Sequence, residues 1–240
     1  MTRRILLAVT GLSPQIVTET LYALAVAQDP PWIPDEIHLI TTSDGANQAR
    51  LLLLSEQPGW FRRLCEDYDL PVIHFDADCI YVVTDTDGQA LDDIRSPEDN
   101  LLAADFITEK VRAFTADTGT ELHVSIAGGR KTMGFFLGYA LSLFGRPRDR
   151  LSHVLVSAPF ESNRDFFYPT RREHVIYTKV PKAKPIDASK ALVSLAEIPF
   201  VSLRHGLPDD LLRGQASYAK AVETARANLG PLTLNIDLRV

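Results

Sequence analysis

Short apolar runs alternate with helix-like segments along the first 156 residues of this 240-residue chain, and this alternation constrains the fold more than any other feature. It is typical of right-handed βαβ units, which build a mostly parallel sheet with helices on both faces. We expect strands at residues 4–9, 36–41, 72–75, 121–126 and 153–156. We expect helices at residues 14–27, 46–64, 97–116 and 130–144. Pro58 and Gly59 predict a break in the second helix, since proline removes a backbone donor.

Residues 80–91 alternate around Asp87 and Gly88, which favours a β-hairpin at the edge of the sheet. After residue 156 the regular alternation of strands and helices changes. The segment PKAKP at 181–185 is typical of a linker, and beyond it we expect strands at 191–195 and 200–203, a helix at 216–228 and a strand in LTLNIDLRV at 232–240. The predicted fold class is α/β, a Rossmann-like mostly parallel sheet with a small C-terminal α+β extension. We expect a ligand-binding domain over residues 1–180 and the extension over 181–240.

Composition excludes several classes of function. The net charge of -6 argues against broad adhesion to DNA or to anionic membranes, both of which need an extended basic face. No apolar stretch approaches the roughly 20 residues that cross a bilayer, and the N-terminal apolar run is too short for a signal peptide. Cys65 and Cys79 have no second cysteine pair or histidine cluster nearby in the sequence, so they indicate neither a zinc site nor a disulfide framework. We expect a soluble cytoplasmic protein with no membrane or DNA partner.

The first candidate ligand loop lies in VTGLSPQIVTETL, residues 9–21. A strand ends at Thr10 and Gly11, and Leu12 leads to Ser13 as the expected helix cap, with Pro14 as the first helical residue. Free backbone N–H groups and the positive end of the helix then lie at the carboxyl edge of the sheet, where open α/β sheets bind ligands. Gln15, in the first turn, is a further candidate contact. The alternative is an ordinary capped turn, in which Ser13 serves only its own helix.

The second candidate loop is the glycine turn in SIAGGRKTMG, residues 125–134. Gly128 and Gly129 lead directly into a helix whose first turn carries Arg130, Lys131 and Thr132. Cations are unfavourable at the positive end of a helix, so a bound anion is the natural compensation. The alternative is a pair of solvated charges on a surface turn. The chain lacks GxGxxG and GxxxxGK[ST], which disfavours a dinucleotide oxidoreductase and a P-loop ATPase.

A third loop after the second strand carries Thr42 and Ser43, which either contact the ligand or cap the next helix. Gly134 and Gly138, four residues apart in one helix, predict close approach of another backbone, either the sheet, which we expect, or a helix of a second subunit. The aspartates between residues 76 and 93 could collect a hard cation, but hairpin turns use aspartate freely, so we expect no metal and no cofactor. The histidines at positions 38, 74, 123 and 174 lie in or beside strands and are interpreted as structural.

The two glycine-containing loops resemble those of the CRISPR-associated Rossmann-fold (CARF) family, with a Thr/Gly/Ser loop after the first strand and a GG-x-K-[ST] turn opening a later helix. SIAGGRKTMG, GRPRDRLSHVLVS and FESNRDFFYP are similar to a subgroup described as ring nucleases. The resemblance covers most of residues 1–180. It implies a homodimer that binds cyclic oligoadenylate, cyclic tetra-adenylate in preference to hexa-adenylate, across its two-fold axis.

The same resemblance implies the chemistry. In ring-cleaving members a serine of the first loop and a lysine of the GG-x-K turn matter most, and these correspond to Ser13 and Lys131. The substrate's own 2′-hydroxyl attacks the adjacent phosphate without a metal, which makes the expected activity that of a metal-independent phosphodiesterase. Lys131 and the N–H groups of Gly129 and Arg130 are expected to stabilise the phosphoryl charge. Such an enzyme switches off the antiviral signal of type III CRISPR systems.

Two alternatives use the same fold. The first is a sensor that binds the ring without cutting it and regulates an effector or transcription, and its pocket residues would be the same. The second is a transcription regulator with a winged-helix tail. The arginines and lysines after residue 200 are too spread out for a DNA-recognition face, which disfavours the regulator.

Overall fold

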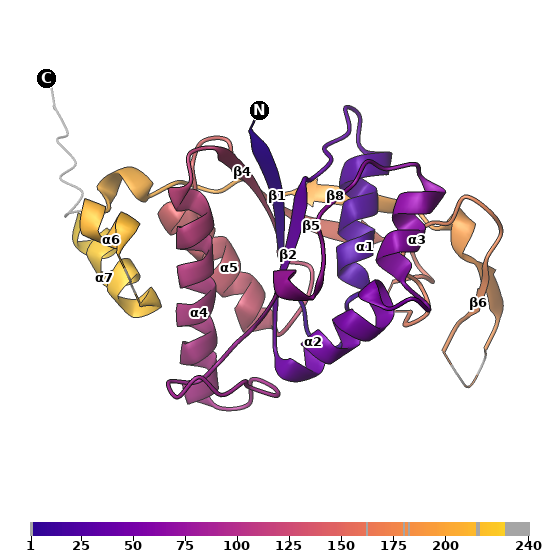
Figure 1. The fold of residues 1–240 in the computed structure, drawn as a ribbon, viewed down its shortest axis with the longest axis horizontal. Helices are drawn as coiled ribbons and strands as arrows, with labels where there is room; N and C mark the ends of the chain where they lie inside the picture. Colours follow the sequence, from indigo (N-terminus) through magenta and orange to yellow (C-terminus); the bar gives the residue numbers. More distant parts are fainter. Residues whose placement is uncertain (1, 162, 180, 182, 215–216, 229–240) are drawn as a thin grey trace, which may run out of the picture.

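The computed structural model describes residues 2–161, 163–179, 181, 183–214 and 217–228 of the chain (Figure 1). The strands are β1 Arg3–Val9, β2 Glu36–Thr41, β3 Ile80–Val82, β4 Thr120–Ser125, β5 Arg150–Val156, β6 Val175–Tyr177, β7 Pro185–Asp187 and β8 Val193–Glu197. The α-helices are α1 Gln15–Tyr22, α2 Ser43–Ala49, α3 Trp60–Asp67, α4 Pro97–Ala116, α5 Lys131–Phe144, α6 Asp209–Arg213 and α7 Tyr218–Asn228. Short π-helical segments are η1 Ala23–Ala27 and η2 Arg50–Leu54, and short 3-10 segments are η3 Ala77–Cys79, η4 Ala188–Lys190 and η5 Arg204–Gly206.

The main sheet has the strand order β3-β2-β1-β4-β5-β8. Strands β3, β2, β1, β4 and β5 run parallel, and β8 pairs antiparallel with β5 at the edge. The order reverses direction between β1 and β4, because the chain moves outward from β1 through β2 to β3 and then returns to the other side of β1. Such a reversal opens a crevice at the carboxyl ends of the two strands, and ligands of open α/β sheets bind in that crevice.

Helices cover both faces of the sheet, as the sequence predicts for buried parallel strands (Figure 1). Helices α4 and α5 lie on one face, over a core that includes Leu7 and Val9 of β1. Helices α1 and α3 lie on the other face, over Leu6 and Ala8 of the same strand. Alternate side chains of β1 therefore enter different cores. The α/β, Rossmann-like fold class is confirmed.

The start of α4 follows its sequence signal. The Ser96 hydroxyl accepts a hydrogen bond from the Asp99 N–H at 3.0 Å, and the Asp99 carboxylate accepts one from the Ser96 N–H at 2.9 Å. Pro97 occupies the first helical position, as predicted. The predicted break at Pro58 and Gly59 is also confirmed, because η2 ends at Leu54 and α3 begins at Trp60. Gly59 has φ +60, a left-handed conformation that favours glycine.

Other predictions are wrong in detail. Ser13 is not the cap of α1, since Pro14 occupies the cap position and no described side chain makes a capping hydrogen bond there. Residues 72–75 form only an isolated bridge between His74 and Glu36 instead of a strand. In the predicted hairpin, residues 80–82 become β3, which pairs in parallel with β2, and only the Thr84–Ala90 bridge is hairpin-like. Residues 200–203 are not a strand, and the strand predicted at 232–240 lies outside the described residues.

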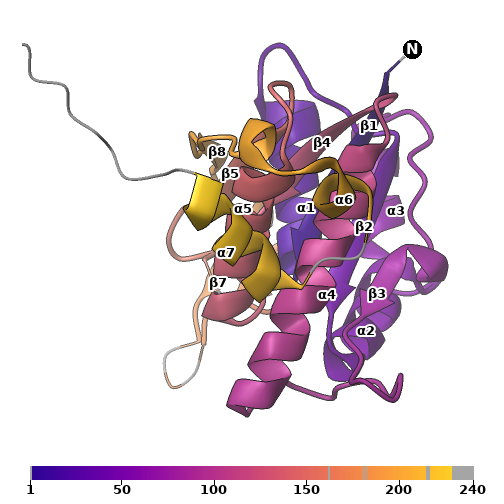
Figure 2. The same ribbon diagram turned by 90° about the vertical axis from the view of Figure 1, so that its left-hand side faces the viewer.

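The described residues after 180 form strands in both sheets and two helices that pack on the rest of the fold. Strand β8 is the antiparallel edge of the main sheet, while β7 pairs with β6 in a two-stranded sheet. Helices α6 and α7 lie against α4 and α5 (Figure 2). The division into residues 1–180 and 181–240 stays a prediction. Among the described residues, no helix is both long and apolar enough to span a membrane.

Candidate functional site

The two predicted ligand loops meet at the point where the strand order reverses. The first follows β1 and leads into α1, and the second follows β4 and leads into α5. They are in close contact, because a Cβ built on Gly11 would lie 3.7 Å from the Gly129 Cα. The backbone N–H groups of Gly128 and Gly129 donate to no acceptor among the described residues. These groups and the uncapped N-terminus of α5 form an anion-binding geometry.

Three glycines make this close approach possible. A Cβ on Gly128 would lie 2.6 Å from the Val9 carbonyl oxygen, and a Cβ on Gly45 would lie 2.8 Å from the Gly11 carbonyl oxygen. Gly129 has φ +73, which side-chain-bearing residues rarely adopt. The sequence analysis placed Gly128 and Gly129 in a candidate ligand loop but did not predict this close contact, and it gave Gly45 no role. Gly45 could have been recognised from the sequence, because glycine destabilises a helix relative to alanine. A glycine in the first turn of a helix therefore indicates that a side chain would not fit there.

Gly128→Ala is expected to lower the free energy of unfolding by about 1–3 kcal/mol, because the new methyl group overlaps the Val9 carbonyl oxygen. Gly138→Ala is the matched control within α5, where the new Cβ meets Leu151 Cδ2 at an ordinary 3.6 Å. That variant should gain about 0.5–1 kcal/mol from helix propensity. Urea unfolding monitored by circular dichroism measures both changes. Equal effects of the two substitutions would contradict the close approach.

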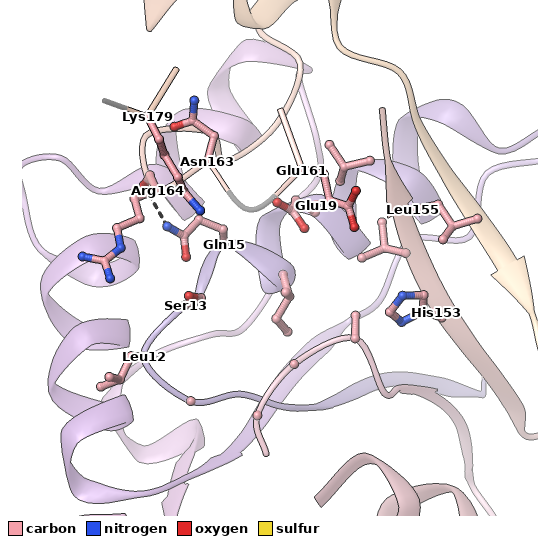
Figure 3. Close-up of a pocket in the computed structure, with 17 residues that line it drawn as sticks. Leu12, Ser13, Gln15, Glu19, His153, Leu155, Glu161, Asn163, Arg164 and Lys179 are labelled. Atoms are coloured by element: carbon pink, nitrogen blue, oxygen red, sulfur yellow. Dashed lines mark hydrogen bonds between the residues drawn. The ribbon is translucent and has the colours of Figure 1, made fainter. Parts of the chain in front are cut away.

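The larger cavity at this edge has a volume of about 530 Å³ (Figure 3). The first loop and α1 form one wall, the second loop forms another, and the end of β5 forms a third. The segment after β5 completes the cavity with Glu161, Asn163 and Arg164, and Lys179 follows β6. The cavity therefore carries hydroxyl, amide, carboxyl and cationic groups, a mixture suited to a ligand that has both phosphates and polar rings.

Gln15 and Ser13 offer polar groups to this cavity. The Gln15 Nε2 donates to the Arg164 carbonyl oxygen at 2.8 Å, which ties α1 to the far wall. The Gln15 Oε1 is buried and has no partner among the described residues. The Ser13 side chain is exposed, and its hydroxyl likewise makes no hydrogen bond within the described part of the chain, while its carbonyl accepts from Thr10 Oγ1 at 3.0 Å. An unused hydroxyl and an unused buried acceptor both suit a bound ligand.

Glu19 lies on α1 in the wall of the cavity and is 8% exposed. Burial, and to a smaller extent the negative charge of Glu161, raise the pKa of its carboxyl group to about 8. The two side chains lie close together in Figure 3. Near neutral pH, Glu19 is therefore mostly protonated and can donate a hydrogen bond, so it does not repel an anionic ligand.

Glu19 should make the protein less stable as the pH rises. Its pKa is about 8 in the folded state and 4.5 ordinarily, so the folded state holds a proton that the unfolded state releases between these values. The contribution of Glu19 to the free energy of unfolding therefore falls by about 1.4 kcal/mol per pH unit between the two pKa values. Above the higher pKa it is constant. Glu19→Gln should flatten this decline, whereas Glu223→Gln at an exposed position should not. Urea unfolding from pH 5 to pH 9 measures how the free energy of unfolding depends on pH. Parallel profiles for wild type and Glu19→Gln would contradict a raised pKa of Glu19.

A second cavity of about 300 Å³ shares Gly11, Leu12 and Gly129 with the first. Its wall includes Thr10 and Thr42 and an ion pair between Arg130 and Asp93. The Arg130 Nε also donates to Asp93 Oδ1 at 3.1 Å, and this guanidinium holds the pKa of Asp93 at about 2. The charge of Arg130, one of the two cations at the start of α5, is thus balanced by Asp93. The sequence analysis did not predict this ion pair.

Lys131 is the other cation, and it makes no ion pair with any described residue. It lies exposed in the first turn of α5, beside Gly129 and Arg130, but its side chain lines neither cavity. Thr132 is also exposed and outside both cavities. Ser43 donates to Asp92 Oδ1 at 2.6 Å and lines neither cavity. The predicted contacts that do line a cavity are Thr10, Gly11, Leu12, Ser13, Gln15, Thr42, Gly128, Gly129 and Arg130.

Sequence reasoning missed the far wall of the larger cavity. Glu19, Glu161, Asn163, Arg164, Lys179 and His153 all line it. FESNRDFFYP was noted as a motif without a role, and its residues Glu161, Asn163 and Arg164 line the cavity together with the first loop. Its aromatic residues explain the position of the segment, because Phe160 and Phe166 are buried against the core beneath β5 and β8.

A model of the family described as CRISPR-associated protein NE0113 matches residues 13–231. No curated protein matches the chain. Among solved structures, the chain is similar to Enterococcus italicus Csm6 bound to cyclic hexa-2′-fluoro-hexa-dAMP, with 14% sequence identity and a TM-score of 0.32. That similarity covers 65% of this chain and 34% of the Csm6 chain. Because the family model spans most of the sequence, the chain belongs to the CRISPR-associated protein NE0113 family.

Proposed function

We propose that this protein is a CARF-type ring nuclease, which binds cyclic oligoadenylate, preferably cyclic tetra-adenylate, and opens the ring. The observation that carries the proposal is the glycine-lined crevice between β1 and β4. There, the N–H groups of Gly128 and Gly129 and the Ser13 hydroxyl, which have no partner among the described residues, share one edge of the sheet with the exposed Lys131. Phosphate groups are the ligands that such an edge binds best. Membership of a CRISPR-associated family supports a substrate that is a signal of type III CRISPR systems.

In the proposed reaction, the ribose 2′-hydroxyl attacks the neighbouring phosphorus and the bond from phosphorus to the 5′-oxygen breaks. The hydroxyl proton is lost and the departing 5′-oxygen gains a proton, which leaves a 2′,3′-cyclic phosphate and a 5′-hydroxyl. Lys131 and the N–H groups of Gly129 and Arg130 stabilise the charge on the phosphoryl oxygens. Ser13 orients the ribose or the phosphate for in-line attack. No metal takes part in these steps.

The remaining groups of the larger cavity suit the nucleosides. The protonated Glu19 can donate to a phosphate or a ring nitrogen, while Glu161 and Asn163 can accept from the adenine amino group. Arg164 and Lys179 add positive charge to the outer wall. A symmetric ring requires identical pockets around a two-fold axis, so the proposal includes a homodimer whose crevices face each other.

The test is an incubation of the purified protein with cyclic tetra-adenylate and cyclic hexa-adenylate in excess EDTA, with products resolved by mass spectrometry. Linear products that carry a 2′,3′-cyclic phosphate, formed faster from the tetra-adenylate ring, are the expected result. An intact ring that binds tightly would contradict the nuclease. The absence of binding to either ring would also contradict the proposal that cyclic oligoadenylate is the ligand.

A non-cleaving sensor is the second candidate, and one observation favours it. The Lys131 side chain lies outside both cavities of the single chain, so it reaches a phosphate only if the dimer or the ligand brings that phosphate to it. In a sensor, the ring would bind to the same crevice and stay intact, and its binding would regulate an effector or transcription. The incubation distinguishes the two candidates directly, because a sensor leaves the ring intact at any incubation time.

A further inference from the structure

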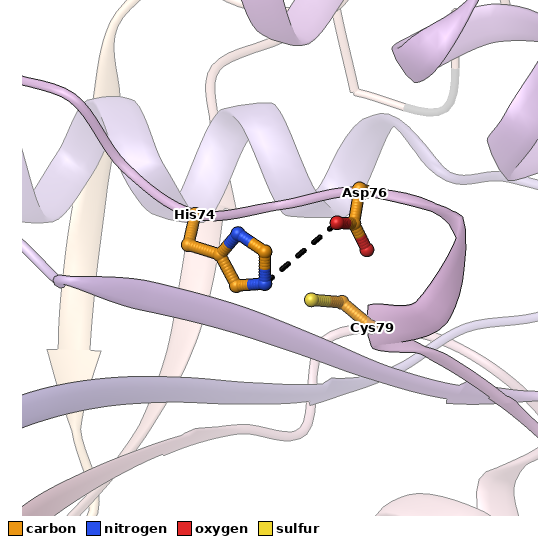
Figure 4. A group of neighbouring side chains, drawn as sticks. All are labelled: His74, Asp76 and Cys79. Atoms are coloured by element: carbon orange, nitrogen blue, oxygen red, sulfur yellow. Dashed lines mark ion pairs between the residues drawn. The ribbon is translucent and has the colours of Figure 1, made fainter.

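A second group of reactive side chains lies at the opposite edge of the sheet. His74, Asp76 and Cys79 fall within six residues of each other, just before β3 (Figure 4). One ligand atom of each residue, an imidazole nitrogen, a carboxylate oxygen and the thiol sulfur, lies within 4.8 Å of the other two. His74 pairs with Glu36, the first residue of β2, so the group lies at the amino ends of the strands. It is therefore remote from the crevice between β1 and β4.

The backbone holds the Asp76 carboxylate toward this group. Asp76 Oδ1 accepts a hydrogen bond from the Asp78 N–H at 2.9 Å, as the cap of η3. The other oxygen, Oδ2, lies 3.7 Å from His74 Nε2, which is too far for a hydrogen bond. The imidazole and the carboxylate thus form an ion pair without a hydrogen bond (Figure 4), and that separation suits two ligands of one cation. A hydrogen bond to the second oxygen of a ligating carboxylate is a common way of orienting it.

Cys79 supplies a sulfur from the protein side of the group. Its side chain is only 2% exposed, whereas His74 and Asp76 are about half exposed and can rotate toward it. Burial is also the main reason that the pKa of the Cys79 thiol is raised, so the free protein holds it protonated at neutral pH. The Cys79 N–H donates to the Asp76 carbonyl oxygen at 3.2 Å, which fixes the turn between the two ligands.

We propose that His74, Asp76 and Cys79 bind a zinc ion, with water as the fourth ligand. Thiolate, imidazole and carboxylate are the three ligand types of zinc in proteins, while the thiolate and imidazole disfavour magnesium and calcium. Ligand atoms about 2.0–2.3 Å from the metal are separated by roughly 3.4–3.6 Å in a tetrahedral site, so small rotations of the two exposed side chains close the present spacing. On binding, the Cys79 thiol releases its proton and the sulfur bonds to zinc.

The proposed zinc would act on stability. It would join the segment that follows α3 to the start of β3, and metal binding to a folded site adds to the free energy of unfolding. The spacing His-x-Asp-x-x-Cys has a single cysteine, so a sequence search for cysteine pairs does not find it. The site is independent of ring cleavage, because none of its residues lines either cavity of the crevice.

Cobalt(II) is the probe, since a cobalt-thiolate bond gives a charge-transfer absorption that carboxylate and imidazole ligands do not give. The untagged full-length chain is titrated with Co²⁺, and Zn²⁺ is then added to displace it and to measure its affinity. One equivalent of Co²⁺ should give the absorption in wild type and in Cys65→Ser, the control at the other cysteine. Cys79→Ser should lose it. His74→Ala, an exposed change that leaves the core intact, should weaken Zn²⁺ binding at least about tenfold.

Thermal unfolding provides a second measurement. Zn²⁺ should raise the melting temperature of wild type and of Cys65→Ser, and should raise that of His74→Ala by less. The absence of a charge-transfer absorption in wild type would overturn the proposal. So would an absorption that survives in Cys79→Ser or that disappears in Cys65→Ser.

Discussion

Lys131→Ala is expected to slow the opening of cyclic tetra-adenylate by roughly 10²–10³-fold, which is the usual effect of removing one preorganised group that stabilises transition-state charge. Asp93 already neutralises Arg130, so Lys131 is the cation at the start of α5 that is left to act on a phosphate. Binding of the intact ring should weaken less than the rate falls, because the backbone N–H groups of the glycine turn still contact the phosphates. Single-turnover kinetics and equilibrium binding, measured separately, give the two effects.

Lys184→Ala is the matched control for this experiment. Lys184 is exposed, and it lines neither cavity. Its removal changes the net charge by the same amount and should leave the rate of ring opening unchanged. If both lysine variants lose activity equally, the general electrostatic attraction of the ring is responsible, and the specific role of Lys131 is wrong.

Asp149→Ala should lower the free energy of unfolding by about 3–5 kcal/mol, since it leaves a buried guanidinium without its counter-ion. The side chains of Arg146 and Asp149 are 8% and 0% exposed. Asp149 Oδ2 accepts from the Arg146 Nε at 2.9 Å, and Oδ1 accepts from Arg146 Nη2 at 2.8 Å and from the Leu122 N–H at 3.0 Å. The carboxylate therefore joins the turn before β5 to the middle of β4.

Asp69→Ala provides the comparison for this ion pair. Asp69 also pairs with an arginine, Arg171, at 2.9 Å, but its side chain is 79% exposed, and exposed ion pairs contribute about 0–1 kcal/mol. The midpoints of urea unfolding should therefore differ clearly between the two variants. Similar midpoints would show that the Arg146 guanidinium reaches water when its partner is removed.

The sequence predicts the helices and strands whose signals are local. Apolar runs locate β1, β2, β4 and β5, and the Ser96–Pro97 start locates α4, because each pattern reflects burial or capping within a few residues. Strand partners are not local. Residues 80–82 alternate as a hairpin strand would, yet they pair in parallel with β2, and no pattern within the segment distinguishes those two partners.

The candidate site divides in the same way. Glycines and a cationic first turn mark the two loops that leave β1 and β4, so these loops are predictable. The contacts that complete the two cavities are different, because the Gln15–Arg164 hydrogen bond and the Arg130–Asp93 pair join residues 149 and 37 positions apart. Glu19 is a further case. Its raised pKa depends on burial beneath a distant segment, and burial of a single glutamate on a helix is not visible in the sequence.

The antiparallel pairing of β8 with β5 determines where the folded unit can end. Residues 193–197 cover the outer hydrogen-bonding edge of β5, and Val193 packs with Val154 beneath it. A chain shortened to residue 180 would expose that edge as a row of unpaired N–H and C=O groups, which is a template for edge-to-edge association with other chains. We therefore expect a chain that lacks β8 to aggregate more readily than one that keeps it.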